Sequence, residues 1–94
     1  MGAVVTWVSG RVAADRQHEV TGAYAAGIAA GLPPDIDQTM LIRDGEELSI
    51  VTVWPRREDL EATLASGEEP FARRLIKQAG GTPSVRIFEL VARR

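Results

Sequence analysis

The chain has 94 residues, which is the length of one domain, and a formal net charge of −2. Its 45% hydrophobic and 26% charged residues are typical of a folded globular protein and exclude a disordered chain. The 13 acidic residues outnumber the 11 basic ones, which are spread along the chain, so we expect no nucleic-acid partner.

Several chemistries need residues that the sequence lacks. It has no Cys, and therefore no disulfide, no thiolate nucleophile and no zinc site built on Cys. No glycine-rich phosphate loop, metal-ligand pair or Ser/His/Asp set can be assembled, so we predict neither a metal site nor a cofactor. There is no basic leader and no apolar run near the ~20 residues that span a bilayer. We therefore expect a cytoplasmic protein without a membrane partner.

The first strand is predicted over residues 3–12, where β-branched and aromatic residues occupy both alternating positions. One of its faces would meet helices, and the other would need a cover. A helix is expected next, with Asp15 as its N-cap and its end near Ala30. The stretch Gly31-Leu32-Pro33-Pro34 ends it. The apolar stripe expected to face the sheet consists of Val20, Ala23, Tyr24, Gly27 and Ile28.

The middle of the chain carries the clearest hairpin pattern. Residues 36–43 alternate in character, Asp44-Gly45 follows as a turn, and an apolar run from Leu48 to Trp54 forms the second strand. Pro55 stops that strand. We therefore predict two antiparallel neighbours in a sheet.

Two helices and a strand are predicted after the hairpin. The first helix spans 58–66, with Leu60 and Leu64 one turn apart. The second begins near Pro70 and ends at Gly80-Gly81. The last strand spans 84–92 and again has apolar residues in both alternating positions. The apolar residues that the second helix is expected to bury are Phe71, Leu75, Ile76 and Ala79.

This order, β-α-β-β-α-α-β, predicts one ferredoxin-like α+β domain over residues 1–94, with an antiparallel sheet and helices on one face. Apolar side chains on both faces of the strands leave one face without a cover. A second copy packed on that face would cover it, so we predict a homodimer. Trp7 and Phe88 are the candidate interface residues, and for Trp7 this role is favoured over substrate contact.

The run Leu48–Leu60, L-S-I-V-T-V-W-P-R-R-E-D-L, together with Phe88-Glu89-Leu90-Val91, resembles proteins of the antibiotic biosynthesis monooxygenase type. In that family two ferredoxin-like subunits pack sheet to sheet and form a dimeric α/β barrel. Each subunit holds a small cleft between its sheet and its helices. Members include cofactor-independent oxygenases of aromatic polyketides, quinol monooxygenases and haem-degrading enzymes.

The resemblance implies a role for only one residue. The family's tryptophan at the end of the third strand matches Trp54, whereas Arg56 stands where the family has a serine. Haem-degrading members use an Asn on the first strand and a His on the helix after the Trp. This chain has no Asn, and its only His precedes that helix by a whole hairpin. Haem degradation is therefore not expected.

Three apolar or aromatic residues are candidate substrate contacts. Trp54 is suited to stacking on a planar aromatic, or else closes the strand end as a core residue. Tyr24 lies on the buried stripe of its helix, with its ring in the core and its hydroxyl near the cleft. Met40 would form an adaptable wall for a ligand or for a packed core.

Two polar residues complete the candidates. His18 is a possible general base, although its charged neighbours indicate a solvated helix surface. Arg86 is placed to hold an anionic oxygen, or else to pair with a carboxylate such as Glu89 at a subunit interface. No catalytic residue can be identified from the sequence.

Two functions remain open. The first, implied by the resemblance, is a cofactor-independent monooxygenase that acts on a small planar aromatic such as a quinol or a polyketide-type phenol. The second is a non-catalytic dimeric protein that binds a small aromatic ligand or serves as an accessory subunit. Whether the protein is an enzyme is not decided by the sequence, because a fold does not dictate a function.

Overall fold

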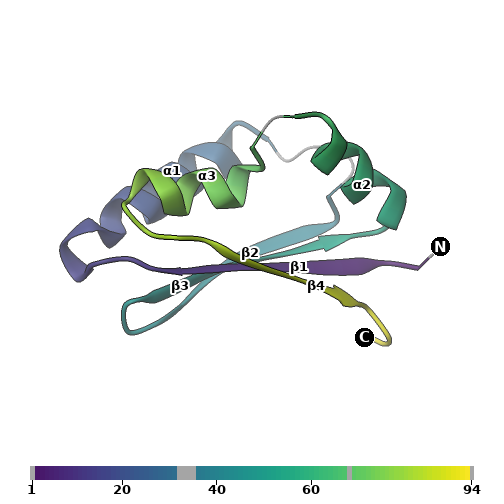
Figure 1. Cartoon of the computed structure of the whole chain (residues 1–94), viewed down its shortest axis with the longest axis horizontal. Helices are drawn as coiled ribbons and strands as arrows, with labels where there is room; N and C mark the ends of the chain where they lie inside the picture. Colours follow the sequence, from purple (N-terminus) through teal and green to yellow (C-terminus); the bar gives the residue numbers. More distant parts are fainter. Residues whose placement is uncertain (1, 32–35, 68, 94) are drawn as a thin grey trace.

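Four strands form one antiparallel sheet, and three α-helices cover one of its faces (Figure 1). The computed structural model describes residues 2–31, 36–67 and 69–93. The predicted α+β class and element order are confirmed. The elements are β1 (Val4–Arg11), the 3-10 turn η1 (Ala14–Arg16), α1 (Gln17–Ala29), β2 (Gln38–Asp44), β3 (Glu47–Trp54), α2 (Arg57–Ala65), α3 (Phe71–Gln78) and β4 (Ser84–Glu89).

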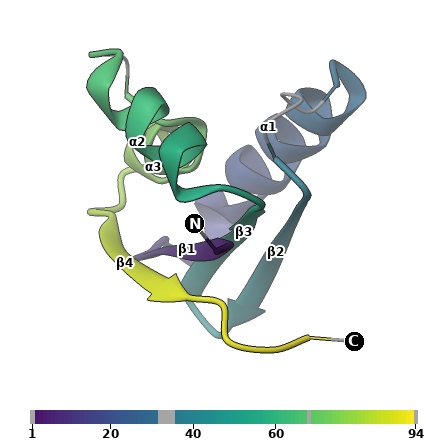
Figure 2. The same cartoon turned by 90° about the vertical axis from the view of Figure 1, so that its right-hand side faces the viewer.

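The strands lie in the order β2-β3-β1-β4, so β1 and β3 form the centre of the sheet and β2 and β4 its edges. The hairpin predicted over the middle of the chain is the β2–β3 pair, and its turn contains Gly45 with a positive φ of 62°. Figure 2 shows all three helices on the same side of the sheet. The other side carries no helix in the described part of the chain.

The helix-covered face carries two groups of buried side chains. The larger group packs α1 and α3 on the sheet, with Leu48 and Ile50 of β3 at its centre. The smaller group lies under α2 and contains Val4, Trp54 and Leu60. Because side chains alternate along a strand, Ser49, Val51 and Val53 of β3 point the other way. The other buried members of the larger group are Val12, Val20, Leu75 and Ala79.

The opposite face of the sheet, which we call the helix-free face, is also apolar. The register sets Trp7 beside Val51, and Val51 beside Met40. The rings of Trp7 and Phe88 lie with centroids 6.4 Å apart. The apolar side chains predicted on both faces of the first strand are therefore present. The apolar residues of the helix-free face are Val5, Trp7, Met40, Ile42, Val51, Val53 and Phe88.

The start of α1 differs from the prediction. Asp15 lies inside the 3-10 turn η1 and is not the N-cap; Arg16 holds that position, and its side chain does not cap the helix. The chain is already turning before the α-helix starts, so the helix begins one residue later than expected. Gly31, with φ 102°, follows the last turn as predicted, and the predicted stop at Leu32-Pro33-Pro34 lies outside the described residues.

Two further expectations are corrected near the C-terminus. Phe71 is not buried, because it lies at the start of α3 with 37% of its surface exposed, whereas Leu75, Ile76 and Ala79 of the same prediction are buried. β4 ends at Glu89 instead of Ala92. The Leu90 N–H donates to the Ala3 carbonyl, and the chain then leaves the sheet.

Gln17 joins three separate segments of the fold. Its buried side-chain Nε2 donates to the Val12 carbonyl at 3.2 Å and to the Gly45 carbonyl at 3.0 Å, and its Oε1 accepts from Arg43 Nη1 at 3.5 Å. The end of β1, the β2–β3 turn and the start of α1 thus meet at one amide. A buried carbonyl that loses its hydrogen-bond donor destabilises the folded protein, because water does not replace the lost bond.

Replacing Gln17 by Met keeps the size of the side chain but removes both donors. We expect Gln17→Met to lower the free energy of unfolding by about 1–3 kcal/mol. The matched control is Gln78→Met on α3, where the residue is exposed and no change is expected. Urea unfolding followed by circular dichroism measures both. Equal midpoints for the two variants would contradict this role of Gln17.

A bilayer-spanning helix needs about 20 apolar residues. Among the described residues no helix has that length and apolar character.

Candidate functional site

A cleft of about 380 Å³ lies between α1 and α3, above β2 and β3. Its described lining is mostly apolar, with two hydroxyl groups and one guanidinium group. A volume of this size suits a small organic molecule. The lining residues are Gly27, Ile28 and Gly31 from α1 and its end, Ile36 before β2, Thr39, Ile50 and Thr52 from the sheet, and Phe71, Ala72 and Arg74 from α3.

The floor of the cleft carries two hydroxyl groups on neighbouring strands. Thr39 and Thr52 are cross-strand partners, and their Oγ1 atoms lie 3.2 Å apart. Thr6 continues this row on β1, where it accepts a hydrogen bond of 3.1 Å from Nε1 of Trp54. In a bonded pair of hydroxyl groups only one proton is used, so the pair retains a donor for a ligand.

One wall of the cleft comes from the first turns of α3. The Arg74 guanidinium lies over the Phe71 ring, with its central carbon 5.7 Å from the ring centroid. Arg74 is exposed and forms no ion pair with any residue that the structure describes. The wall therefore offers an aromatic ring together with a cation that forms no ion pair in the described part of the chain, although its charge, after that of Lys77, helps to lower the pKa of the Glu69 carboxyl. Such a pair suits a flat ligand that carries a negative oxygen.

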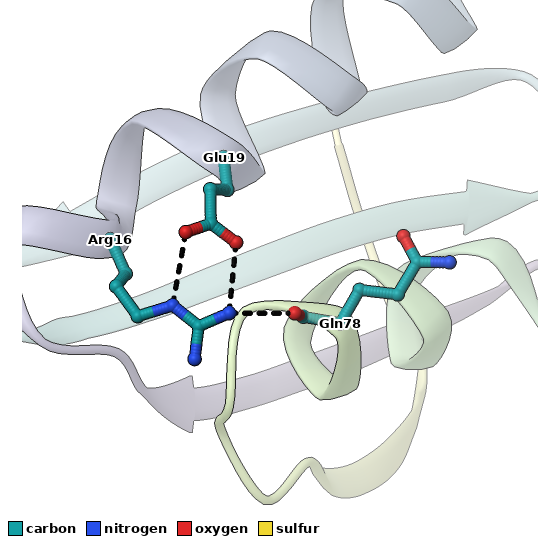
Figure 3. A network of polar contacts seen from close by, with 3 residues as sticks. All are labelled: Arg16, Glu19 and Gln78. Carbon is teal, nitrogen blue, oxygen red and sulfur yellow. Dashed lines mark hydrogen bonds and ion pairs between the residues drawn. The ribbon is translucent and has the colours of Figure 1, made fainter.

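The other end of the α1–α3 pair is joined by a polar link (Figure 3). Arg16 donates from Nε and Nη2 to the two carboxylate oxygens of Glu19, and Nη2 also donates to the Gln78 carbonyl, each at 3.0 Å. Gln78 is the last residue of α3, where helix carbonyls lack intrahelical partners and a cation is favourable. The helices are thus tied at the end that lies away from the cleft.

This link shifts the ionisation of both groups. The hydrogen bond from Arg16 holds the pKa of the Glu19 carboxyl below its ordinary value, and the same bond raises the pKa of Arg16. Because the folded-state pKa of Glu19 is lowered, any contribution of the pair to stability is present above the ordinary carboxyl pKa. It is lost as the pH falls through the lowered value.

We expect Arg16→Gln to raise the pKa of Glu19 toward its ordinary value. Lys77→Gln is the matched control, because Lys77 lowers the pKa of a different carboxyl, that of Glu69, through a bond of 2.7 Å. Carboxyl carbon chemical shifts followed through a pH titration measure both groups. A Glu19 midpoint that moves with Lys77→Gln, or stays fixed with Arg16→Gln, would refute the assignment.

The structure places none of the five candidate substrate residues in the described lining of the cleft. Trp54 is buried with Val4 and Leu60, and Ile36, which lines the cleft, packs against this group. Tyr24 is partly buried against the larger core. His18 is exposed at the start of α1. Ligand contact by these residues stays a prediction.

Met40 and Arg86 lie on the helix-free face, because the register pairs them with Val51 and Trp7. The Arg86 guanidinium lies 4.7 Å from the centroid of the Phe88 ring on that face. The sheet separates both side chains from the cleft, so a ligand bound there in the same chain would not reach them. The expected orientation of Arg86 toward the cleft is therefore not seen.

Sequence reasoning missed the polar residues of the cleft. Thr39 and Thr52 interrupt the apolar pattern at facing positions of the two hairpin strands, and this is a signal that could have marked the floor. Arg74 stands in the pair Arg73-Arg74 on a short helix, where nothing in the sequence tells which residue faces the cleft. The described residues hold no group of three or more His, Asp or Glu that could bind a metal.

No family model and no curated protein matches the sequence. Solved structures do match. A putative antibiotic biosynthesis monooxygenase from Deinococcus radiodurans is 13% identical, with a TM-score of 0.70, and the match covers 97% of this chain and 95% of that one. SnoaB, a cofactor-independent oxygenase from Streptomyces nogalater, matches in a mutant form at 17% identity and TM-score 0.68, over 100% and 96% of the two chains.

A third matching structure is the heme-degrader MhuD from Mycobacterium tuberculosis, with two hemes bound in its active site. It is 20% identical, with a TM-score of 0.67, and the match covers 97% of this chain and 98% of that one. Identities this low establish a shared fold and no shared activity. The chain therefore has the ferredoxin-like fold of the antibiotic biosynthesis monooxygenase type, and the resemblance predicted from the sequence is confirmed at the level of the fold.

Proposed function

We propose that the protein is a cofactor-independent oxygenase for a small planar aromatic with an acidic hydroxyl group, such as a quinol or a polyketide-type phenol. The observation that carries the proposal is the apolar cleft of about 380 Å³, in which Arg74 is the sole charged residue of the described lining. The likeness in fold to a cofactor-independent oxygenase adds support.

The chemistry requires a substrate anion in a site from which water is largely excluded. A cation beside a phenol lowers the pKa of its hydroxyl, so Arg74 favours the phenolate, and the proton leaves to solvent at the exposed mouth. The electron-rich anion then reacts with O2. For an anthrone, the reacting CH2 carbon becomes C=O; it loses two hydrogen atoms and gains one oxygen atom, and the second oxygen atom leaves as water.

A second candidate function is binding without turnover. It is favoured by one feature of the cleft: the described lining offers no carboxylate or imidazole that could act as a general base. The same ligand class would then be held by the same residues. Oxygen consumption distinguishes the two functions, because a binding protein takes up ligand without using O2.

The test is oxygen uptake by the purified protein with a panel of hydroquinones and anthrones. We expect Arg74→Gln to lower kcat/KM roughly 10- to 100-fold, the size of an effect expected for a hydrogen bond to a charged group. Arg56→Gln is the control, because Arg56 is an exposed arginine before α2 and outside the cleft lining. Uptake no faster than in buffer, with ligand bound, would favour the binding protein over the oxygenase.

We propose further that two copies pair through the helix-free face. The supporting observation is the exposure of large apolar side chains there, with Trp7 38% exposed and Met40 and Ile42 similar. A hollow lined by Trp7, Arg86 and Phe88 lies on the same face. Water in contact with such a surface is unfavourable, and a two-fold pair of identical faces removes it.

Sedimentation at micromolar concentration tests the pairing. We expect the parent protein to sediment as a dimer and Trp7→Glu as a folded monomer, because the change would place a charge in the apolar interface. Leu64→Glu is the control: Leu64 lies on α2, is 46% exposed and is outside the helix-free face, so the dimer should persist. A monomeric parent protein would rule out the pairing.

A further inference from the structure

Gly27 occupies a position where glycine is unfavourable unless packing requires it. It lies inside α1, and glycine destabilises a helix interior relative to alanine. A Cβ placed on Gly27 would lie 2.4 Å from Cζ and 2.8 Å from Cε1 of the Phe71 ring. The tip of the ring therefore rests directly against the backbone of α1, and a side chain at position 27 would have to displace it.

Gly22, in the same helix, shows that this contact is specific. A Cβ at Gly22 would meet no atom of the described residues within 4 Å, so none of them packs against this glycine. Both glycines lie inside the same helix, and of the two only Gly27 has the Phe71 ring against it. The close contact at Gly27 is therefore caused by the placement of Phe71, and it is not a general property of α1.

Phe71 reaches across from α3 to α1 and contributes its ring to the cleft. The ring lines the cleft together with Gly27 and Arg74, and it is not part of either buried core group. A large aromatic side chain that remains 37% exposed gains less from burial than its size allows. Its ring is therefore available to a ligand as a contact surface beside the Arg74 cation.

We infer that Phe71 is the residue that selects planar aromatic ligands in this cleft, and that Gly27 is a positioning residue that seats its ring. The inference rests on the proposed function and names the feature of the ligand that the site recognises. Aromatic rings gain energy from each other beyond simple area burial, whereas a saturated and puckered ring does not. Arg74 would recognise the oxygen of the ligand, and Phe71 its flatness.

The experiment compares two probes with the same carbon skeleton, 2-naphthol and its saturated form decahydro-2-naphthol, by titration calorimetry. For Phe71→Leu we expect 2-naphthol to bind roughly two- to tenfold more weakly and decahydro-2-naphthol to bind unchanged. Gly27→Ala should show the same pattern, because the new Cβ displaces the ring. Gly22→Ala should bind both probes like the parent protein.

A double variant separates seating from any other effect of the alanine. Leucine lacks the ring atoms that a Cβ at position 27 would meet, so Gly27→Ala combined with Phe71→Leu should bind 2-naphthol no more weakly than Phe71→Leu alone. Thermal unfolding checks that each variant is folded. Should Gly27→Ala fail to fold, Phe71→Leu carries the test.

The outcomes keep this inference apart from the proposed function. A parent protein that binds neither probe overturns the proposed function and the inference with it. A parent protein that binds 2-naphthol, with Phe71→Leu and Gly27→Ala unchanged toward both probes, overturns the inference alone. Loss of 2-naphthol affinity in both variants, with decahydro-2-naphthol unaffected, supports it.

Discussion

The burial of β3 on both of its faces fixes the positions of the cleft and of the helix-free face. From Leu48 to Trp54 each residue of this strand is buried. One alternating set supports the helices and supplies Ile50 and Thr52 to the cleft, and the other set supplies Val51 and Val53 to the helix-free face. A shift of the pairing by one residue would exchange the two sets, so the register that forms the cleft also forms the apolar face opposite to it.

The two surfaces differ in what they require. The helices α1 and α3 are tied together at one end, where Arg16 meets the Gln78 carbonyl, and at the other end the Phe71 ring packs on Gly27 beside the cleft. The helix-free face is made by the strands alone. The apolar surface of the helix-free face follows from which residues alternate along the strands, whereas the shape of the cleft depends on how α1 and α3 pack.

This difference explains how much the sequence could predict. Alternation and turn residues were sufficient for the hairpin, and they located β2 and β3 to within about two residues. They could not assign Met40 or Arg86 to a face, because both alternating positions of these strands carry apolar groups and neither pattern is unique. Phe71 was expected in the core because it is apolar and starts a helix. Its exposure depends on the distance between two helices, which no local pattern encodes.

The candidate site was the least predictable part for the same reason. Trp54 was the most visible aromatic residue of the hairpin, yet its indole N–H is satisfied by Thr6 and its ring lies in the core group under α2. The polar side chains that line the cleft are individually ordinary: two threonines and an arginine. They become a site through the register of two strands and the orientation of two helices, both of which are tertiary properties.

The separate environments of the two tryptophans give the molecule two intrinsic optical reporters. Trp54 is enclosed and hydrogen-bonded, so its emission changes when the chain unfolds. Trp7 stands partly in water on the opposite side of the sheet, so its emission changes when that side is covered. Since the chain contains no other tryptophan, replacing either one with phenylalanine leaves a spectrum that reports on one side of the sheet alone.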